Sequence, residues 1–448
     1  MNALASNMPP QQIVPIMMPI VVNYMQNQSP GHRKAAMMSV AVIIEGCAEY
    51  ISTMLKEILP IVCAGLQDPE MIVRRAACMA LSCLAEELPV EMAEHHQAIM
   101  PLVFNLLNDT NPEITKHACN ALDPMLDGLE GEVLQYLPML MEKLIWLLDN
   151  AQQTDTKATS LGAIGSAAHS AGEGFQPYFN EVMPRIRNFM SATNGTDEAL
   201  LRGVATDTAG AIAEAVGAEV FRPHTQDFMN LAIEQLTLDS PRLRECSYAF
   251  FSVIAGVFGE EFAPFLPTIM PAILHSCKAE ESNEPNLETE IDLTVGDDDE
   301  EDLDEDDLSG LNFNSAIADE KEFACDALGE LFENTRSHFL PYVDESLQAL
   351  VEATGHLFDG VRKASLGSLF AYIKTFYSLS SGGDWVQGLP VTYPVHENVQ
   401  KILQLAIPTV LTMWSDEDDR MVAVQICKEL IQALKLMGPC VVADRKYL

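Results

Sequence analysis

Acidic side chains recur at matching positions of a repeated helical motif in this sequence. When the second helices of the repeats are superposed on their Ala-Leu positions, three columns at i, i+3 and i+7 share one helical face. The polar residues in these columns are Glu45, Glu86, Asn120, Asp123, Asp127, Asp207, Glu214, Tyr248, Asp326 and Glu333. Carboxylates pair with Lys and Arg side chains, and an Asn amide can hold a peptide backbone in register. The pattern predicts a binding surface for an extended basic peptide, although a solvated helix face without a ligand would show the same acids.

A second acidic feature is the run DDDEEDLDEDD at 297–307. Its acids are Asp297, Asp298, Asp299, Glu300, Glu301, Asp302, Asp304, Glu305, Asp306 and Asp307. Such a run cannot pack into a core, so we expect it to be disordered or only partly ordered. It is compatible with a solubilising spacer or with a mobile polyanion that contacts a basic ligand or a regulatory protein.

The elements that must position these acids are paired helices. The segment ILPIVCAGLQDPEMIVRRAACMALSCLAEEL at 58–88 returns 41 residues later as IMPLVFNLLNDTNPEITKHACNALDPMLDGL. A period near 40 residues built from two helices is typical of HEAT or armadillo solenoids. Proline near the start of the first helices and Asp in the turns, followed by Arg or Lys, support a HEAT repeat. We therefore predict an all-α, right-handed HEAT superhelix of about nine helix pairs, with the acidic run inserted inside the seventh.

The predicted organisation has six parts. They are a frayed or non-native start at 1–12, repeats 1 to 6 and the first helix of repeat 7 at 13–278, the acidic insertion at 279–317, the second helix of repeat 7 with repeat 8 at 318–378, a loop insertion at 379–398, and repeat 9 with a tail at 399–448.

Composition excludes several classes of function. The net charge of −39 opposes direct nucleic-acid binding and favours basic partners. The ten cysteines show no Cys-x-x-Cys spacing, which indicates reduced core thiols rather than a metal site. No apolar run is long enough to predict a membrane span, and no secretory signal is visible. We find no catalytic, cofactor or metal motif, and we expect a monomer that is not an enzyme.

Several longer stretches resemble a known family. ADEKEFACDALGELFENTRSHFLPYV at 318–343, SLGAIGSAAHSAG and LRECSYAFFSVIAGVFGEEFAPFLP, together with the order of repeats and the acidic insertion, resemble the importin-β (karyopherin-β) family. The resemblance is strongest to the importin-four branch, whose fungal members import ribosomal proteins and histones H3 and H4. The chain is shorter than these receptors and resembles a central fragment.

The resemblance implies a nuclear import receptor that shuttles between cytoplasm and nucleus. It implies that basic cargo binds the concave face, that the small GTPase Ran in its GTP form releases it, and that Phe-Gly nucleoporins contact the outer helices. The acidic run would contact Ran or basic cargo. Two alternatives stay open: a static HEAT scaffold of a phosphatase-like complex, whose repeats are more uniform and lack such an insertion, and an acidic histone chaperone.

Overall fold

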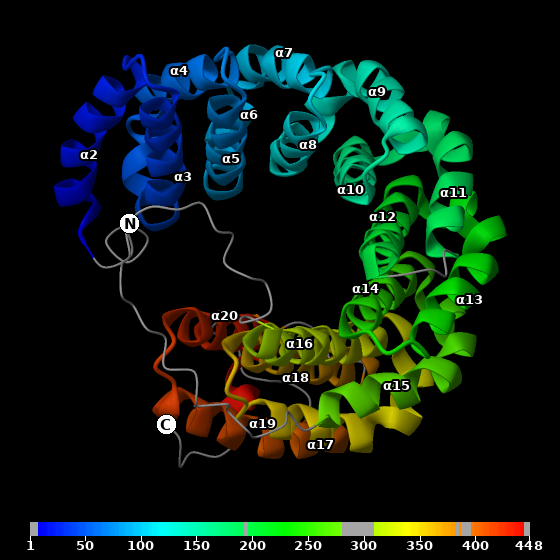
Figure 1. Cartoon of the computed structure of the whole chain (residues 1–448). Coiled ribbons are helices and arrows are strands. Elements are labelled where there is room, and N and C mark those ends of the chain that lie inside the picture. The colour runs from blue at the N-terminus through cyan, green and yellow to red at the C-terminus, as the bar shows by residue number, and fades with distance from the viewer. Residues whose placement is uncertain (1–7, 192–195, 280–308, 381–384, 387–395, 443–448) are drawn as a thin grey trace. The chain divides into compact units, whose positions relative to one another are not determined.

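The chain folds into pairs of antiparallel helices, as a computed structural model shows (Figure 1). The structure describes residues 8–191, 196–279, 309–380, 385–386 and 396–442. Over these residues it forms nine helix pairs with no strand, which confirms the predicted HEAT solenoid. In each pair we call the two members the first and the second helix.

The chain divides into two compact units, 1–228 and 229–448. The helices of unit 1 are α2 (Pro10–Met25), α3 (Pro30–Ser52), α4 (Leu55–Leu66), α5 (Met71–Glu87), α6 (Pro89–Ala93), α7 (His96–Leu107), α8 (Pro112–Asp127), η1 (Glu130–Gln135), α9 (Leu137–Asn150), α10 (Thr154–Ala171), η2 (Gly172–Phe175), α11 (Gln176–Met190), α12 (Thr196–Phe221) and η3 (Arg222–His224). Helix α13 (Thr225–Gln235) runs across the division.

The helices of unit 2 are α14 (Pro241–Phe258), η4 (Gly259–Phe265), α15 (Leu266–Lys278), α16 (Ser309–Thr335), η5 (Arg336–Tyr342), α17 (Val343–Ala353), α18 (Asp359–Leu379), α19 (Glu397–Asp416), α20 (Arg420–Met437) and η6 (Gly438–Val442).

Second helices pack side by side in each unit. In unit 1 the row is α3, α5, α8, α10 and α12, and each member also packs against the first helix of its own pair. Figure 1 shows this row along the inside of the unit's curve and the first helices along the outside. In unit 2 the corresponding row is α14, α16, α18 and α20. The apolar face of each helix is buried between the two rows, which leaves one side of every second helix open.

Ion pairs connect successive repeats at the turn before the second helix. Arg33 donates to Asp68, Arg74 to Asp109 at 2.9 Å, and Lys116 to Asp155 at 2.7 Å. In each case the cation lies on a second helix and the acid lies in or just after the turn of the next repeat. The predicted Asp and Arg pattern is confirmed at these turns, because a carboxylate there accepts from a cation one repeat earlier.

Some predicted helix boundaries are wrong. Prolines were expected at the starts of first helices, but α4 begins five residues before Pro60 and α7 five residues before Pro101. Proline does occupy the first turn of the first helices α9 and α15, as predicted, at Pro138 and Pro267. It also occupies the first turn of several second helices, as Pro112 does in α8, where its missing N–H leaves no bond unmade. Helix α2 already begins at Pro10, inside the segment predicted to fray. Helix α16 begins at Ser309, within the predicted insertion.

Two helical stretches, Pro30–Ser52 and Pro241–Lys278, are long and apolar enough to cross a membrane by length and composition alone. The second stretch is not one straight helix, because α14 ends at Gly259 with φ of +57°. The first is α3, which packs between α2 and α5. Both stretches therefore serve as packed members of helix pairs.

Glycines with positive φ end three second helices and kink a fourth, α12, near its end. Their φ values are +51° at Gly172, +76° at Gly217, +57° at Gly259 and +65° at Gly438. These residues combine positive φ with an extended ψ, a region that only glycine adopts readily. Gly438 is also in contact with Trp385, whose backbone N–H donates to the Leu436 carbonyl at 2.9 Å.

Gly329 lets α16 approach α18 closely. A Cβ at this position would clash with Ser368 Oγ and lie 2.9 Å from Ser368 Cα. Ser368 Oγ donates to the Cys325 carbonyl at 2.7 Å, and this hydrogen bond from α18 to α16 keeps Ser368 next to Gly329. We expect Gly329→Ala to lower the free energy of unfolding by about 1–3 kcal/mol through overpacking, measured by urea denaturation.

Gly367 of α18 provides the matched control, because a Cβ there would meet no atom within 4 Å. Gly367→Ala should raise the free energy of unfolding by up to about 1 kcal/mol through the better helix propensity of alanine. If Gly329→Ala and Gly367→Ala changed the free energy of unfolding in the same direction, the close approach of α16 and α18 would be contradicted.

Candidate functional site

The predicted acidic residues of unit 1 lie on the open side of its row of second helices. Glu45 of α3, Glu86 of α5, Asn120, Asp123 and Asp127 of α8 and Glu214 of α12 are exposed, and Asp207 of α12 is half-buried. Neighbouring second helices cover both flanks of α5, α8 and α10 and one flank of α3 and α12, and the first helix of each pair covers a further side. The exposed side chains therefore occupy the remaining side, which is common to the whole row. We call the carboxylates of Glu45, Glu86, Asp123, Asp127 and Glu214 the acidic face of unit 1.

Side-chain contacts show that these positions are neighbours from one repeat to the next. Ser166 of α10 donates a hydrogen bond to Asp123 of α8. His169, one turn further along α10, lies 3.8 Å from the carboxylate of Glu214 on α12. At the other end of the row, burial raises the pKa of the Cys83 thiol, and the charges of Glu86 and Glu45 raise it further. The columns read from the sequence therefore correspond to adjacent side chains in unit 1.

The electrostatics of the acidic face are strongest at Asp127. Partial burial raises the pKa of its carboxyl above the ordinary value, and the negative charge of Asp123 raises it further, while His169 opposes the shift. A cation placed between two carboxylates that repel each other relieves the repulsion and is attracted by both charges. A lysine or arginine side chain would supply that charge.

Sequence analysis missed His169, which is 60% exposed and faces Glu214. It lies one helical turn after Ser166, on the same face of α10, so extending the columns by one turn would have found it. His169, Glu173 and Glu214 line a cavity of 370 Å³ together with the turn glycines Gly172 and Gly217. The cavity extends the acidic face toward the ends of α10 and α12.

In unit 2, two predicted residues are exposed and one is not. Asp326 and Glu333 are exposed on α16. Tyr248 of α14 is 0% exposed, and its hydroxyl lies 2.8 Å from Ser276 Oγ in the core. The predicted ligand contact at Tyr248 is therefore wrong. Helix α14 carries Ala249-Phe250 where other repeats have Ala-Leu, and its open side falls one residue later, at Gly256 rather than Ala255.

Asp326 titrates near neutral pH. Partial burial raises the pKa of its carboxyl to about 7, and Glu322 and Glu330 contribute in the same direction. Because an unfolded Asp has a pKa of about 3.9, ionisation of Asp326 destabilises the fold. The stability that the protonated carboxyl gives to the fold, relative to the ionised carboxylate, is fully present below pH 4 and is lost as the pH rises through 7.

We therefore expect the Tm of Asp326→Asn, relative to the wild type, to rise by about 2 °C or more between pH 5 and pH 8. Thermal unfolding at four pH values between 5 and 8 measures the difference. A constant difference over that range would contradict the raised pKa of Asp326.

The acidic run at 297–307 lies outside the described residues.

Comparisons with known proteins agree with this architecture. The family model described as importin subunit beta-1-like, TPR repeats matches residues 112–294, and the HEAT-like repeat model matches 30–84 and 71–123. The probable importin subunit beta-4 of Schizosaccharomyces pombe is 38% identical over 293 residues, which cover 64% of this chain and 28% of that protein. Importin-4 of Homo sapiens is 30% identical over 309 residues, covering 65% of this chain and 28% of that protein.

The fold matches a solved structure as well. The crystal structure of Kap121p superposes with a TM-score of 0.73 at 20% identity, covering 99% of this chain and 41% of that chain. The chain thus spans less than a third of the curated relatives and about two fifths of the solved one. The relatives, the matched repeat models and the paired-helix architecture agree, and over about two thirds of its length the chain is similar to part of the importin-β proteins.

Proposed function

We propose that the chain acts within a nuclear import receptor and binds Lys- and Arg-rich localisation signals, such as those of histones or ribosomal proteins. The observation that carries the proposal is the acidic face of unit 1, where carboxylates of α3, α5, α8 and α12 are exposed on one side of the row, with Ser166 and His169 of α10 between those of α8 and α12. An extended cationic peptide that runs across these helices would pair with one or two carboxylates per repeat. Asp326 and Glu333 would offer the same chemistry in unit 2.

Related proteins support a peptide-binding role. Solved structures of Kap121p include complexes with the SUMO protease Ulp1p, Ste12p and Pho4p, and a mutant of Kap121p has three acidic residues replaced by lysine. Kap121p has also been solved bound to Nup53p. For this chain we infer contacts with Phe-Gly nucleoporins through its first helices, where Met139 and Trp146 of α9 are 56% and 53% exposed.

Release of cargo by RanGTP belongs to the same proposal. A solenoid in which each repeat contacts only its neighbours distributes a change of curvature over many small interfaces. Cargo would stabilise one curvature and RanGTP another, so each ligand would weaken binding of the other. The receptor would then shuttle, loading cargo in the cytoplasm and releasing it in the nucleus.

Fluorescence anisotropy with a labelled histone H3 tail peptide tests the proposal. The 448-residue chain should bind the peptide, and the affinity should fall steeply between 50 and about 200 mM salt because the attraction is electrostatic. A peptide with Glu in place of Lys and Arg should not bind. Addition of GTP-loaded Ran, but not GDP-loaded Ran, should release the H3 peptide. Retention of the peptide regardless of nucleotide would favour a histone chaperone or scaffold.

A further inference from the structure

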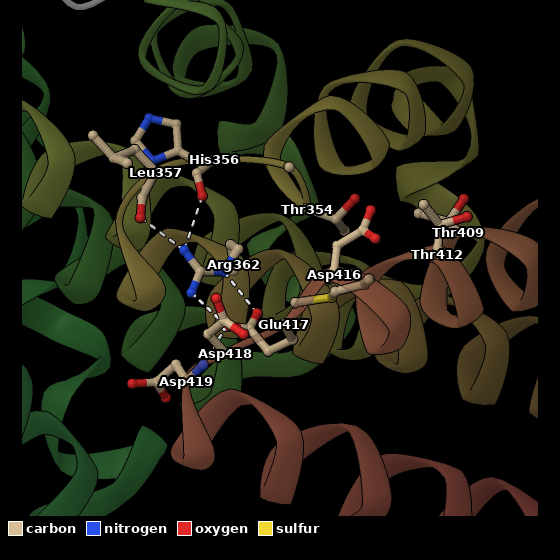
Figure 2. A pocket seen from close by; sticks show the side chains of 12 residues that line it. Thr354, His356, Leu357, Arg362, Thr409, Thr412, Asp416, Glu417, Asp418 and Asp419 are labelled. Atoms are coloured by element: carbon tan, nitrogen blue, oxygen red, sulfur yellow. Dashed lines mark hydrogen bonds and ion pairs between the residues drawn. The ribbon is translucent and has the colours of Figure 1, made fainter.

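Unit 2 contains a cavity of 850 Å³ at the edge formed by the turns of its last two repeats (Figure 2). The turn at 354–357 and the start of α18 form one side. The end of α19 and the turn at 417–419 form the other. The cavity is separate from α16, which carries Asp326 and Glu333, and it shares no residue with the columns read from the sequence.

Arg362 holds the walls of the cavity in place. Its guanidinium donates to both carboxylate oxygens of Glu417, at 2.8 and 2.7 Å. It also donates to the carbonyl oxygens of His356, at 3.0 Å, and Leu357, at 2.7 Å. The side chains of Arg362 and Glu417 are only 16% and 4% exposed, so the pair is a fixed part of the wall. One residue thereby ties the turn before α18 to the turn before α20, as Figure 2 shows.

The four acids at the cavity have different roles. Glu417 is neutralised by Arg362. Asp419 caps α20, because its Oδ1 accepts from the backbone N–H groups of Met421, at 2.8 Å, and Val422, at 2.9 Å. Asp416 and Asp418 are both exposed, and in the described part of the chain neither carboxylate accepts a hydrogen bond or an ion pair. These two carboxylates are available to a cation from outside.

The cavity also offers an apolar contact. Met413 lines it and is 7% exposed, while Leu357, at the tip of the turn, is 84% exposed. Leu357 is held in this position by the hydrogen bond from Arg362 to its carbonyl. An exposed leucine beside a cavity, next to two unpaired carboxylates, favours a ligand that carries an aliphatic group and a positive charge within a few residues of each other.

We propose that this cavity is a second docking site, which takes a short basic peptide segment containing an aliphatic residue next to Lys or Arg. The aliphatic side chain packs against Leu357 and Met413, and the cation pairs with Asp416 and Asp418. Charge complementarity excludes an acidic segment, because four carboxylates and a single guanidinium line the cavity. The site is independent of the acidic face of unit 1, and it gives a partner a second point of attachment.

Methyl NMR of the full chain tests this site directly, with the peptide acetyl-Gly-Ser-Leu-Lys-Arg-Ser-Gly as the probe. Methionine methyl groups are labelled with carbon-13, and the Met413 signal is assigned by its loss in Met413→Leu. The peptide should shift the Met413 signal in a saturable way. Asp416→Lys combined with Asp418→Lys should weaken that binding at least about tenfold, since two ion pairs become repulsive. Leu357→Ser, which removes no buried contact, should weaken it about threefold or more.

The charge-reversed variant Asp127→Lys with Glu214→Lys is the matched control, because it changes the net charge by the same amount in unit 1. It should leave the Met413 titration unchanged. The proposal is overturned if the peptide binds without moving the Met413 signal, if Asp416→Lys with Asp418→Lys titrates like the wild type, or if a peptide with Glu in place of Lys and Arg binds equally well.

Discussion

A chain carrying Asp127→Lys and Glu214→Lys is expected to bind the histone H3 tail peptide at least about tenfold more weakly than the wild type. Both carboxylates are exposed on the open side of the second-helix row, and they flank His169 on the helix between them. Replacing them with lysines puts two like charges beside an already cationic ligand. Fluorescence anisotropy at 100 mM salt measures the loss, and the difference from wild type should shrink as salt rises.

A control separates this effect from the general acidity of the chain. Asp344 and Glu345 are exposed acids at the start of α17, away from both second-helix rows. The variant Asp344→Lys with Glu345→Lys carries the same change in net charge and should alter affinity less than about twofold. Equal losses in the two variants would mean that the acids of unit 1 act only through net charge.

The second large effect concerns stability. Glu320 of α16 is 5% exposed and accepts from Arg244 at 2.8 Å, and Ser276 donates a further hydrogen bond to it. Tyr248 completes the network through Ser276. Removal of the carboxylate leaves a largely buried guanidinium unpaired. We expect Glu320→Ala to lower the free energy of unfolding by about 3 kcal/mol in urea denaturation.

An exposed ion pair in the same unit provides the comparison. Glu345 accepts from Lys278 at 2.5 Å, and the two side chains are 60% and 42% exposed. Glu345→Ala should cost no more than about 1 kcal/mol, because water solvates both charges after the change. If Glu320→Ala costs no more than Glu345→Ala, the buried network contributes no special stability.

Much of the fold was predictable because the repeat is visible in the sequence. The recurrence of Asp68 as Asp109 after 41 residues identifies the turn, and the structure places both acids on cations of the preceding repeat. The helix starts were less predictable, since proline at Pro60 and Pro101 is tolerated inside the helix.

The candidate site was predictable only where neighbouring repeats share a register. Glu86 and Asp127 are exposed as the columns require, whereas Tyr248 turns into the core because the aromatic residues of α14 shift its packing by one position. The spacing of the columns places His169 on the same face of α10 as Ser166, but its interaction with an acid 45 residues away depends on how α10 stacks on α12. The prediction that the chain is not an enzyme is confirmed, because importin-β proteins are transport receptors.

The four glycines with positive φ in or after second helices have a genetic consequence. Every single-nucleotide missense change of a glycine codon introduces an L-amino acid with a β-carbon. At Gly172, Gly217, Gly259 and Gly438 the backbone lies where such residues are strained, whatever space surrounds them. Alleles altered at these four codons should therefore lower the amount of folded receptor in the cell while leaving its ligand-binding residues intact.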